Sequence, residues 1–273
     1  MRASQGDTHD GKNQESYSVN AKEHDSLSLN STLYLAYRDV GVLIERHLFS
    51  KLPSGKLKFL DYGCGVGLST QIILHHLKKN PNYDIEVTGV DINEANLLLA
   101  KEKLPQVAFK RISPQSGFDQ TEKFDLITCN FVLVEMKEAQ MLLVLEALKN
   151  ILSENGILIV TNPTGRAYRP ENHWFTFNNQ FTENVPTRKK EGSEKLRYIE
   201  DQPVKMQVFA SAGSDQSFTF FDYFHSGSAY RRTYTAAGLK LLETHKPTGK
   251  PDDKIAWCAE AEVPPYKLHI LGR

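Results

Sequence analysis

An aspartate followed by three alternate glycines is the segment of this chain best suited to bind a ligand. Asp61 precedes Gly63, Gly65 and Gly67, with an apolar run before it and a stretch of helical spacing after it. Such a strand–turn–helix presents backbone N–H groups at the beginning of a helix, where carboxylate or phosphate groups bind favourably. Glycine lets the ligand approach the main chain and supplies any positive φ that the turn requires. The segment therefore predicts a ligand-binding turn, with a surface turn that binds nothing as the alternative.

The spacing of these glycines excludes two common nucleotide sites. A dinucleotide fingerprint, Gly-x-Gly-x-x-Gly, fails because its last position would hold Leu68 or Thr70 instead of glycine. A P-loop fails because no Gly-Lys-Ser/Thr follows the turn. The pattern that remains is Asp-x-Gly-x-Gly-x-Gly, from Asp61 to Gly67.

A second carboxylate, Asp91, directly follows the next predicted strand, 85–90, and Ile92 comes after Asp91. Rossmann-type folds place a carboxylate at the end of the strand beside the glycine turn, where it accepts hydrogen bonds from ribose hydroxyls. Asp91 also precedes a predicted helix that begins at Asn93, so capping that helix is the alternative role. Together with the glycine turn, Asp91 favours a ligand that contains a ribose.

Strands and helices alternate through the part of the chain that holds these residues. Predicted strands cover 57–62, 85–90, 107–112, 124–129 and 157–160, and predicted helices cover 32–49, 67–79, 93–103 and 137–152. This alternation predicts a parallel sheet with right-handed crossovers. Beyond Pro163 the pattern changes. The later segments predict a hairpin from 204–209 and 218–224, a helix from 228–237, and strands from 239–243 and 264–271.

This combination of turn, aspartate and element order resembles the class I S-adenosylmethionine (SAM)-dependent methyltransferases. The resemblance covers residue 56 to the C-terminus, and its later part depends on Asp222–Ser226, Ala237–Leu239 and Pro264–Tyr266. Leu239 departs from the Ala-Gly-Phe that similar proteins often show. The resemblance implies an α/β fold with a Rossmann-like, seven-stranded, mostly parallel sheet whose last strand is antiparallel. Helices on both faces and an insertion, or lid, after strand five are also implied.

The resemblance further implies where SAM binds, leaving S-adenosylhomocysteine after transfer. The methionine end is expected at the glycine turn, and the adenosine is expected at Asp91 and Ile92. Asn130 and Phe131 lie where similar proteins contact the methionine part through main-chain carbonyls, with a purely structural role as the alternative. The residues of the glycine turn in this prediction are Asp61, Gly63, Cys64, Gly65 and Gly67.

Two further cofactor contacts are weaker expectations. Similar proteins often place an acidic residue after strand three to meet the adenine amine, and Ser113 stands there in this chain. Arg38, on the first predicted helix, is a candidate partner of the SAM carboxylate, with an exposed helix arginine as the favoured alternative.

The chemistry requires little beyond positioning, because SAM carries its methyl group on a positively charged sulfur that is already a good leaving group. The protein must align donor and acceptor about 3 Å apart and exclude water, and no metal is expected. An oxygen acceptor usually needs a base. His225 is the candidate, with Asp222 either orienting it or binding an amine; an ordinary surface histidine is the alternative. Trp174, Phe177 and Tyr223 are expected either to line the acceptor pocket or to pack the lid onto the sheet.

These expectations divide the chain into five segments. They are a flexible N-terminal arm (1–25), an N-terminal helical lid (26–55), the SAM-binding core (56–162), the insertion with its hairpin (163–225), and a C-terminal helix and hairpin that complete the core sheet (226–273).

The amino-acid composition indicates which classes of binding partner are not expected. The 273 residues contain 33 Lys+Arg and 33 Asp+Glu, so the formal net charge is zero and a nucleic-acid partner is not expected. The three cysteines are far apart, which suits a reducing compartment and excludes a Cys-x-x-Cys zinc motif. No apolar run approaches the ~18 residues of a membrane span, so a cytoplasmic protein without membrane contact is expected.

The function predicted from the sequence is methyl transfer from SAM to an oxygen or nitrogen atom of a small molecule. Two alternatives stay open: a SAM-binding protein without methyl transfer, and a methyltransferase that acts on a protein.

Overall fold

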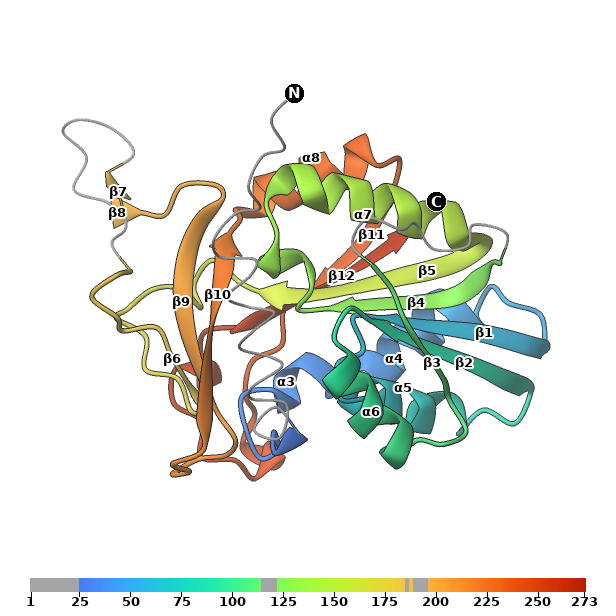
Figure 1. Cartoon of the computed structure of the whole chain (residues 1–273), viewed down its shortest axis with the longest axis horizontal. Coiled ribbons are helices and arrows are strands. Elements are labelled where there is room, and N and C mark those ends of the chain that lie inside the picture. Colours follow the sequence, from blue (N-terminus) through green and yellow to red (C-terminus); the bar gives the residue numbers. More distant parts are fainter. Residues whose placement is uncertain (1–24, 114–121, 185–186, 189–195) are drawn as a thin grey trace.

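Seven strands form the main sheet, in the order β11–β12–β5–β4–β1–β2–β3 (Figure 1). The computed structural model describes residues 25–113, 122–184, 187–188 and 196–273, so the predicted arm lies outside the described residues except for its last position. The strands are β1 Gly55–Tyr62, β2 Tyr83–Asp91, β3 Ala108–Arg111, β4 Phe124–Asn130, β5 Leu152–Pro163, β11 Lys240–His245 and β12 Tyr266–Gly272. From β5 to β3 the strands pair parallel, whereas β12 is antiparallel to both β5 and β11. The predicted sheet, including its antiparallel last strand, is confirmed.

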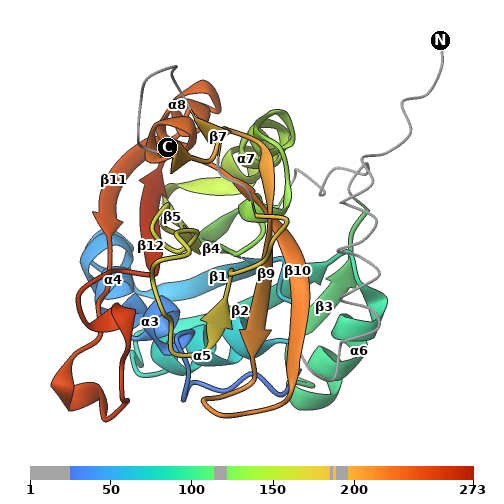
Figure 2. The ribbon, with the colours of Figure 1, turned by 90° about the vertical axis from the view of Figure 1, so that its left-hand side faces the viewer.

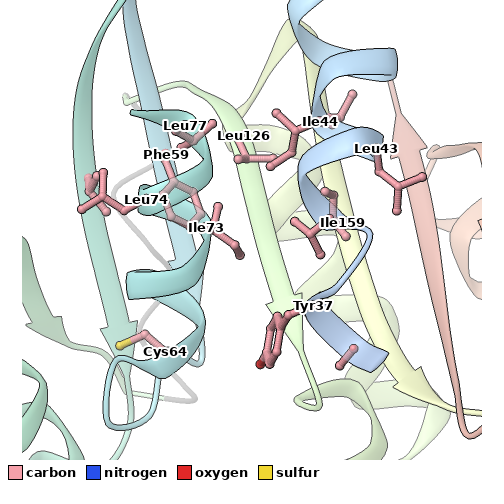
Figure 3. Close-up of a cluster of buried hydrophobic side chains, with 14 of the residues drawn as sticks. Tyr37, Leu43, Ile44, Phe59, Cys64, Ile73, Leu74, Leu77, Leu126 and Ile159 are labelled. Atoms are coloured by element: carbon pink, nitrogen blue, oxygen red, sulfur yellow. The ribbon is translucent and has the colours of Figure 1, made fainter. Parts of the chain in front are cut away.

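Helices cover both faces of this sheet, because successive residues of a strand point to opposite sides. On one face, Phe59, Leu126 and Ile159 pack against α5 (Leu68–Leu77), α6 (Glu94–Lys103) and the N-terminal helices (Figure 3). On the other face, Leu60 and Ile127 pack against α7 (Glu138–Ile151) and α8 (Gly227–Ala236). The carboxyl ends of the parallel strands stay uncovered by these helices, which leaves that edge available for a site.

The N-terminal helix differs from the single helix predicted over 32–49. It is divided into α3 (Tyr34–Tyr37), α4 (Val40–Ile44) and a π-helical turn, η1 (Glu45–Phe49). Asp39 interrupts the helix with φ −101° and ψ 1°, and its carboxylate accepts hydrogen bonds from Arg38 and lies 2.7 Å from His245 Nε2. Aspartate side chains that bond nearby groups compete with regular helix geometry. These helices pack on the main sheet, so most of their apolar residues belong to its core.

The insertion after β5 forms a second, smaller sheet with the order β10–β9–β6. The predicted hairpin is confirmed: β9 (Gln202–Phe209) pairs antiparallel with β10 (Ser217–Phe224), and β6 (Phe177–Asn178) adds to β9. A separate short pair joins β7 (Thr187–Arg188) to β8 (Leu196–Arg197). Figures 1 and 2 show the small sheet standing across the carboxyl ends of the main strands. It therefore covers the edge of the main sheet that the helices leave open.

Candidate active site

A cavity of about 960 Å³ lies between the two sheets. On the side of the main sheet it is lined by the glycine turn after β1 and by the ends of β2 and β4. On the side of the small sheet it is lined by Phe177, Met206, Val208, Phe218, Phe220 and Asp222. Leu33 and Tyr37 from the N-terminal segment and Gln140, Leu143 and Val144 from α7 also line it. Segments far apart in the sequence thus form one enclosure.

The glycine turn brings backbone to the cavity, but its three glycines serve different purposes. Gly63 and Gly65 line the cavity with φ values of +73° and +51°, which glycine adopts without the steric cost that other residues have. A Cβ on Gly63 would lie 2.2 Å from Cγ2 of Val132, so a side chain does not fit there. Gly67 does not line the cavity. Its φ is +85°, and a Cβ would lie 3.3 Å from Cβ of Ala100 on α6, so it allows two helices to approach.

Asp91 lies at the cavity with 9% of its surface exposed. The N–H groups of Gly65 and Asn93 each donate a 2.8 Å hydrogen bond to it, to Oδ2 and Oδ1 respectively. Burial, the largest influence, raises the pKa of Asp91, and these hydrogen bonds oppose it. The helix cap is not Asp91 but Asn93, whose side chain accepts from the first N–H groups of α6. Each carboxylate oxygen of Asp91 retains capacity for a further donor.

Asp61 is fully buried and does not line the cavity. The hydroxyls of Ser69 and Thr70 both donate to Oδ2 at 2.6 Å, and Thr128 donates to Oδ1 at 2.8 Å. These bonds connect β1 to the first turn of α5 and to β4. Asp61 therefore holds the turn in place from behind, while the neighbouring Cys64 lines the cavity.

The end of β4 is the other part of the main sheet that meets the cavity, through Asn130 and Phe131. Phe131 has φ +60°, an uncommon conformation for a bulky residue, and its ring packs edge-on against Tyr266 at 5.2 Å. Nδ2 of Asn130 is buried and has no hydrogen-bond partner among the described residues. A buried amide without a partner is unfavourable, so this atom is available to a ligand. Ile92 also lines the cavity and is 36% exposed.

Besides Asp61 and Gly67, two further predicted cofactor residues do not line the cavity. Ser113 is exposed, whereas its neighbours Arg111 and Ile112 line the wall. Arg38 bonds elsewhere: its guanidinium pairs with Asp39 and Asp253 and donates to the carbonyl oxygen of Thr248 at 2.8 Å. Through Thr248 and Asp253, Arg38 attaches the N-terminal helix to the C-terminal loop, and its contact with the SAM carboxylate stays a prediction from the sequence.

Asp222 is the buried acid on the opposite wall, with 1% of its surface exposed. The hydroxyl of Tyr168, itself buried, donates to Oδ2 at 2.9 Å. Oδ1 has no partner among the described residues. Burial raises the pKa of Asp222 to about 7, with the Tyr168 hydrogen bond opposing the rise. The carboxyl group therefore changes its protonation state close to neutral pH.

His225, the candidate base predicted from the sequence, does not line the cavity. Its Nε2 lies 2.9 Å from the carbonyl oxygen of Met136, and its Nδ1 lies 3.7 Å from Asp201. Burial lowers the pKa of this histidine. The histidine comes directly after β10, and its contact with Met136, the residue that follows the η2 segment (Leu133–Glu135), attaches the hairpin there.

Of the three predicted lid residues, one lines the cavity and two do not. Phe177 lines the cavity, and Trp174 stacks behind it with ring centroids 4.8 Å apart. Tyr223 is buried without lining the cavity, and Nζ of Lys137 lies 5.9 Å from its ring centroid. Strand alternation explains this, because Tyr223 must point away from the face that presents Asp222.

Several wall residues were not foreseen from the sequence. Phe218 and Phe220 share a strand face with Asp222, and the period of two in β10 is a signal that would have found them. Met206 on β9 follows the same rule. Tyr266, which also lines the cavity, and Tyr168, which bonds Asp222 from behind the wall, carry no such signal, because only the folded chain brings them to this place.

Among the described residues, no group of three His, Cys, Asp or Glu side chains is arranged to hold a metal ion. Within the same ranges, no helix combines the length and the apolar character required to cross a bilayer.

Comparisons with known proteins agree with this geometry. Residues 53–213, more than half of the chain, match the family described as "Methyltransferase domain". Together with the seven-stranded sheet, this match shows that the chain belongs to the class I SAM-dependent methyltransferase family.

Individual relatives are more distant. The chain is similar to a trans-aconitate 2-methyltransferase of Variovorax paradoxus, with 28% identity over 141 residues that cover 51% of this chain and 52% of the relative. It is also similar to a carboxy-S-adenosyl-L-methionine synthase of Psychrobacter sp., with 22% identity over 179 residues that cover 62% of this chain and 65% of the relative. The chain thus spans less than two thirds of the length of each. A solved SAM-dependent methyltransferase from Clostridium acetobutylicum has the same fold, with a TM-score of 0.57 at 15% identity over 86% of this chain and 91% of that one.

Proposed function

We propose that this protein transfers a methyl group from SAM to an oxygen or nitrogen atom of a small molecule bound in the cavity between its two sheets. One observation carries the proposal: a single cavity joins the glycine turn and Asp91 on one wall to Asp222 on the other. Its volume of about 960 Å³ is near the upper end of the range for small-molecule sites, which suits a pair of ligands. The segment 163–225 acts as the lid that encloses the acceptor.

The proposed SAM site uses the wall of the main sheet. Asp91 accepts hydrogen bonds from the ribose hydroxyls, and the exposed side of Ile92 packs on the adenine. Gly63 and Gly65 allow the methionine part to approach the backbone, and Nδ2 of Asn130 is available to it. Asp61 contributes by positioning this turn through its three hydroxyl partners.

Asp222 is the proposed base for the acceptor. Methyl transfer to oxygen or nitrogen releases a proton, which a carboxylate beside the reacting atom can accept. A base is most effective when its pKa lies near the working pH, and burial brings the pKa of Asp222 to about 7. Oδ1, which has no partner among the described residues, is the atom that would receive the proton.

Calorimetric titration of SAM into the wild type and the Asp91→Ala variant tests the cofactor assignment. We expect a loss of affinity of about tenfold or more, since losing even one charged hydrogen bond corresponds to about 1.4 kcal/mol or more. Asp84→Ala is the matched control, because Asp84 is exposed on the same strand at the opposite end. Equal affinities for wild type and Asp91→Ala would contradict the ribose assignment.

A second candidate function is a reaction of SAM without transfer of its methyl group. The similarity to a carboxy-S-adenosyl-L-methionine synthase supports this second candidate. Incubation with SAM and a metabolite extract separates the two functions. Stoichiometric formation of S-adenosylhomocysteine with a methylated product supports methyl transfer, whereas a modified SAM without S-adenosylhomocysteine supports the second function.

A further inference from the structure

The half of the cavity that faces the small sheet differs in chemistry from the half that faces the glycine turn. Its wall is formed mainly by apolar side chains from β6, β9 and β10. These are Phe177, Met206, Val208, Phe218 and Phe220. In this apolar surface Asp222 is the ionisable group, so the site combines a large apolar contact with one point of charge.

The carboxyl group of Asp222 is incompletely satisfied. Tyr168 donates to Oδ2 at 2.9 Å, but Oδ1 is buried and has no partner among the described residues. Asp222 is 1% exposed, so bulk water does not solvate it in place of a partner. A buried carboxylate without a counter-charge is unfavourable, and a cationic or hydrogen-donating ligand relieves that cost.

Acidic residues outnumber basic residues in the described wall of the cavity. The acidic residues of the described wall are Asp91, Glu94, Glu135 and Asp222, whereas Arg111 is its one basic residue. Arg111 belongs to the other half, because its Nε donates to the carbonyl oxygen of Ile92 at 3.2 Å. No lysine, arginine or histidine of the described wall therefore faces the apolar half. An anionic acceptor would find no counter-charge there, and it would meet a carboxylate of the same sign.

We propose that the methyl acceptor is an apolar amine whose nitrogen donates a hydrogen bond to Oδ1 of Asp222. This inference rests on the proposed function and names the substrate class of the same site. An ammonium group supplies the positive charge that the Asp222 carboxylate lacks, which a hydroxyl group does not. The rest of the amine is an aliphatic or aromatic skeleton that packs on Phe218, Phe220 and Met206.

The proposed reaction begins with a proton transfer. An N–H bond of the bound ammonium breaks and its proton passes to Oδ1 of Asp222, which leaves a neutral amine beside a neutral carboxyl group. The apolar wall favours this neutral pair, because burial penalises charged groups. The nitrogen lone pair then forms the C–N bond while the C–S bond of SAM breaks and its electron pair stays on sulfur. The products are a methylated ammonium and the neutral thioether S-adenosylhomocysteine, and Asp222 releases its proton to solvent.

This substrate class differs from the one named for the relative that methylates trans-aconitate, whose acceptor is a polycarboxylate. The matched part of that relative covers only 52% of its length. An apolar wall with a lone carboxylate is unsuited to such an acceptor.

The test compares amines, alcohols and carboxylates built on the same phenylalkyl and linear alkyl skeletons. Methylation is read by product mass with labelled SAM, and acceptor binding is read by calorimetry in the presence of S-adenosylhomocysteine. We expect the amines to bind and to be methylated in preference to both other classes. Asp222→Asn should reduce kcat/KM for the best amine by about 100-fold or more, the typical contribution of a positioned base. The affinity of the Asp222→Asn variant for SAM should remain within about twofold of wild type, because Asp222 lies on the wall opposite the proposed SAM site.

Asp215→Asn is the matched control, since Asp215 is exposed in the turn between β9 and β10 and should leave activity unchanged. Preference for alcohols or carboxylates, an absence of amine binding across the panel, or full activity of Asp222→Asn would overturn the inference. Each of these can occur while SAM binds normally and some other acceptor is methylated, in which case methyl transfer to a small molecule survives and only the acceptor class or the role of Asp222 is refuted. Failure of the wild type to bind SAM would instead refute the proposed function itself.

Discussion

At the scale of single residues, three buried aspartates differ in what their oxygen atoms bind. Asp61 has both oxygens occupied by hydroxyls of its own chain, and Asp91 accepts one backbone N–H on each oxygen. Asp222 has one oxygen bound by Tyr168 and one without a partner among the described residues. The number of partners thus orders them from structural support to ligand contact.

This difference makes the stability contribution of Asp222 depend on pH. Its pKa is about 7 in the folded protein and near 3.8 when unfolded, so the folded state binds more protons between these values. Stability is therefore lost as pH rises through about 7. The full effect is on the order of 4 kcal/mol, since each pH unit between the two values contributes about 1.4 kcal/mol.

We predict that Asp222→Asn unfolds at a higher temperature than wild type at pH 8, and that the difference shrinks at pH 5.5, where the wild-type carboxyl is already protonated. Thermal unfolding of both proteins at the two pH values checks this, with Asp215→Asn as a control that shows no such trend. A difference that is constant or larger at pH 5.5 would refute the explanation.

At the scale of elements, the site depends on two turns that meet at the carboxyl edge of the main sheet. The turn after β1 contains Gly63, and the turn after β4 contains Val132, whose side chain occupies the space beside the glycine. Phe131, with its positive φ, precedes Val132 in the second turn. Neither turn can change shape without displacing the other.

Two glycine substitutions should separate the backbone cost from the packing cost. Gly63→Ala and Gly213→Ala both place alanine at positive φ, which costs about 1–2 kcal/mol, and nothing lies within 4 Å of the Cβ added at Gly213. Gly63→Ala also forces its Cβ to within 2.2 Å of Val132 Cγ2, which adds about 1–3 kcal/mol. In Gly63→Ala/Val132→Ala the excess should disappear. Chemical denaturation of the three variants and Val132→Ala completes the cycle, and independent, additive effects of Gly63→Ala and Val132→Ala would contradict the predicted contact.

At the scale of the whole molecule, one buried glutamate connects three distant parts of the chain. Oε1 of Glu260 accepts from the hydroxyl of Thr32 at 2.5 Å and from the N–H of Phe175 at 2.8 Å. Thr32 precedes α3, Phe175 belongs to the insertion, and Glu260 lies in η4 (Ala259–Ala261), before β12. Glu260 thus attaches the N-terminal segment and the lid to the C-terminal part of the main sheet.

We predict that Glu260→Ala lowers the free energy of unfolding by about 3 kcal/mol, because the buried Thr32 hydroxyl and the partly buried Phe175 N–H lose their acceptor. Glu260→Gln retains an acceptor oxygen and should recover at least half of this loss. Urea denaturation measures both variants. Equal losses for alanine and glutamine would show that the oxygen atom is not what holds these segments together.

The sequence by itself determined the fold, and it singled out the residues of the main sheet that line the cavity, where we propose that SAM binds. Hydrophobic period, glycine spacing and the aspartate after β2 are local signals, and parallel strands carry them to one edge of the sheet in a way that topology dictates. The prediction of one continuous helix over 32–49 failed because the bonds of Asp39 to Arg38 and His245 override local propensity.

Only the tertiary structure decided the wall formed by the small sheet, where we propose that the acceptor binds. His225 and Asp222 are near neighbours in sequence, and their residue types favoured the histidine as base. Strand alternation and the docking of the small sheet turn Asp222 into the cavity beside Tyr168, while His225 bonds Met136 outside it. The character of the site depends on burial and on which atoms lack partners, and both are set by contacts between residues remote in sequence, which no local pattern encodes.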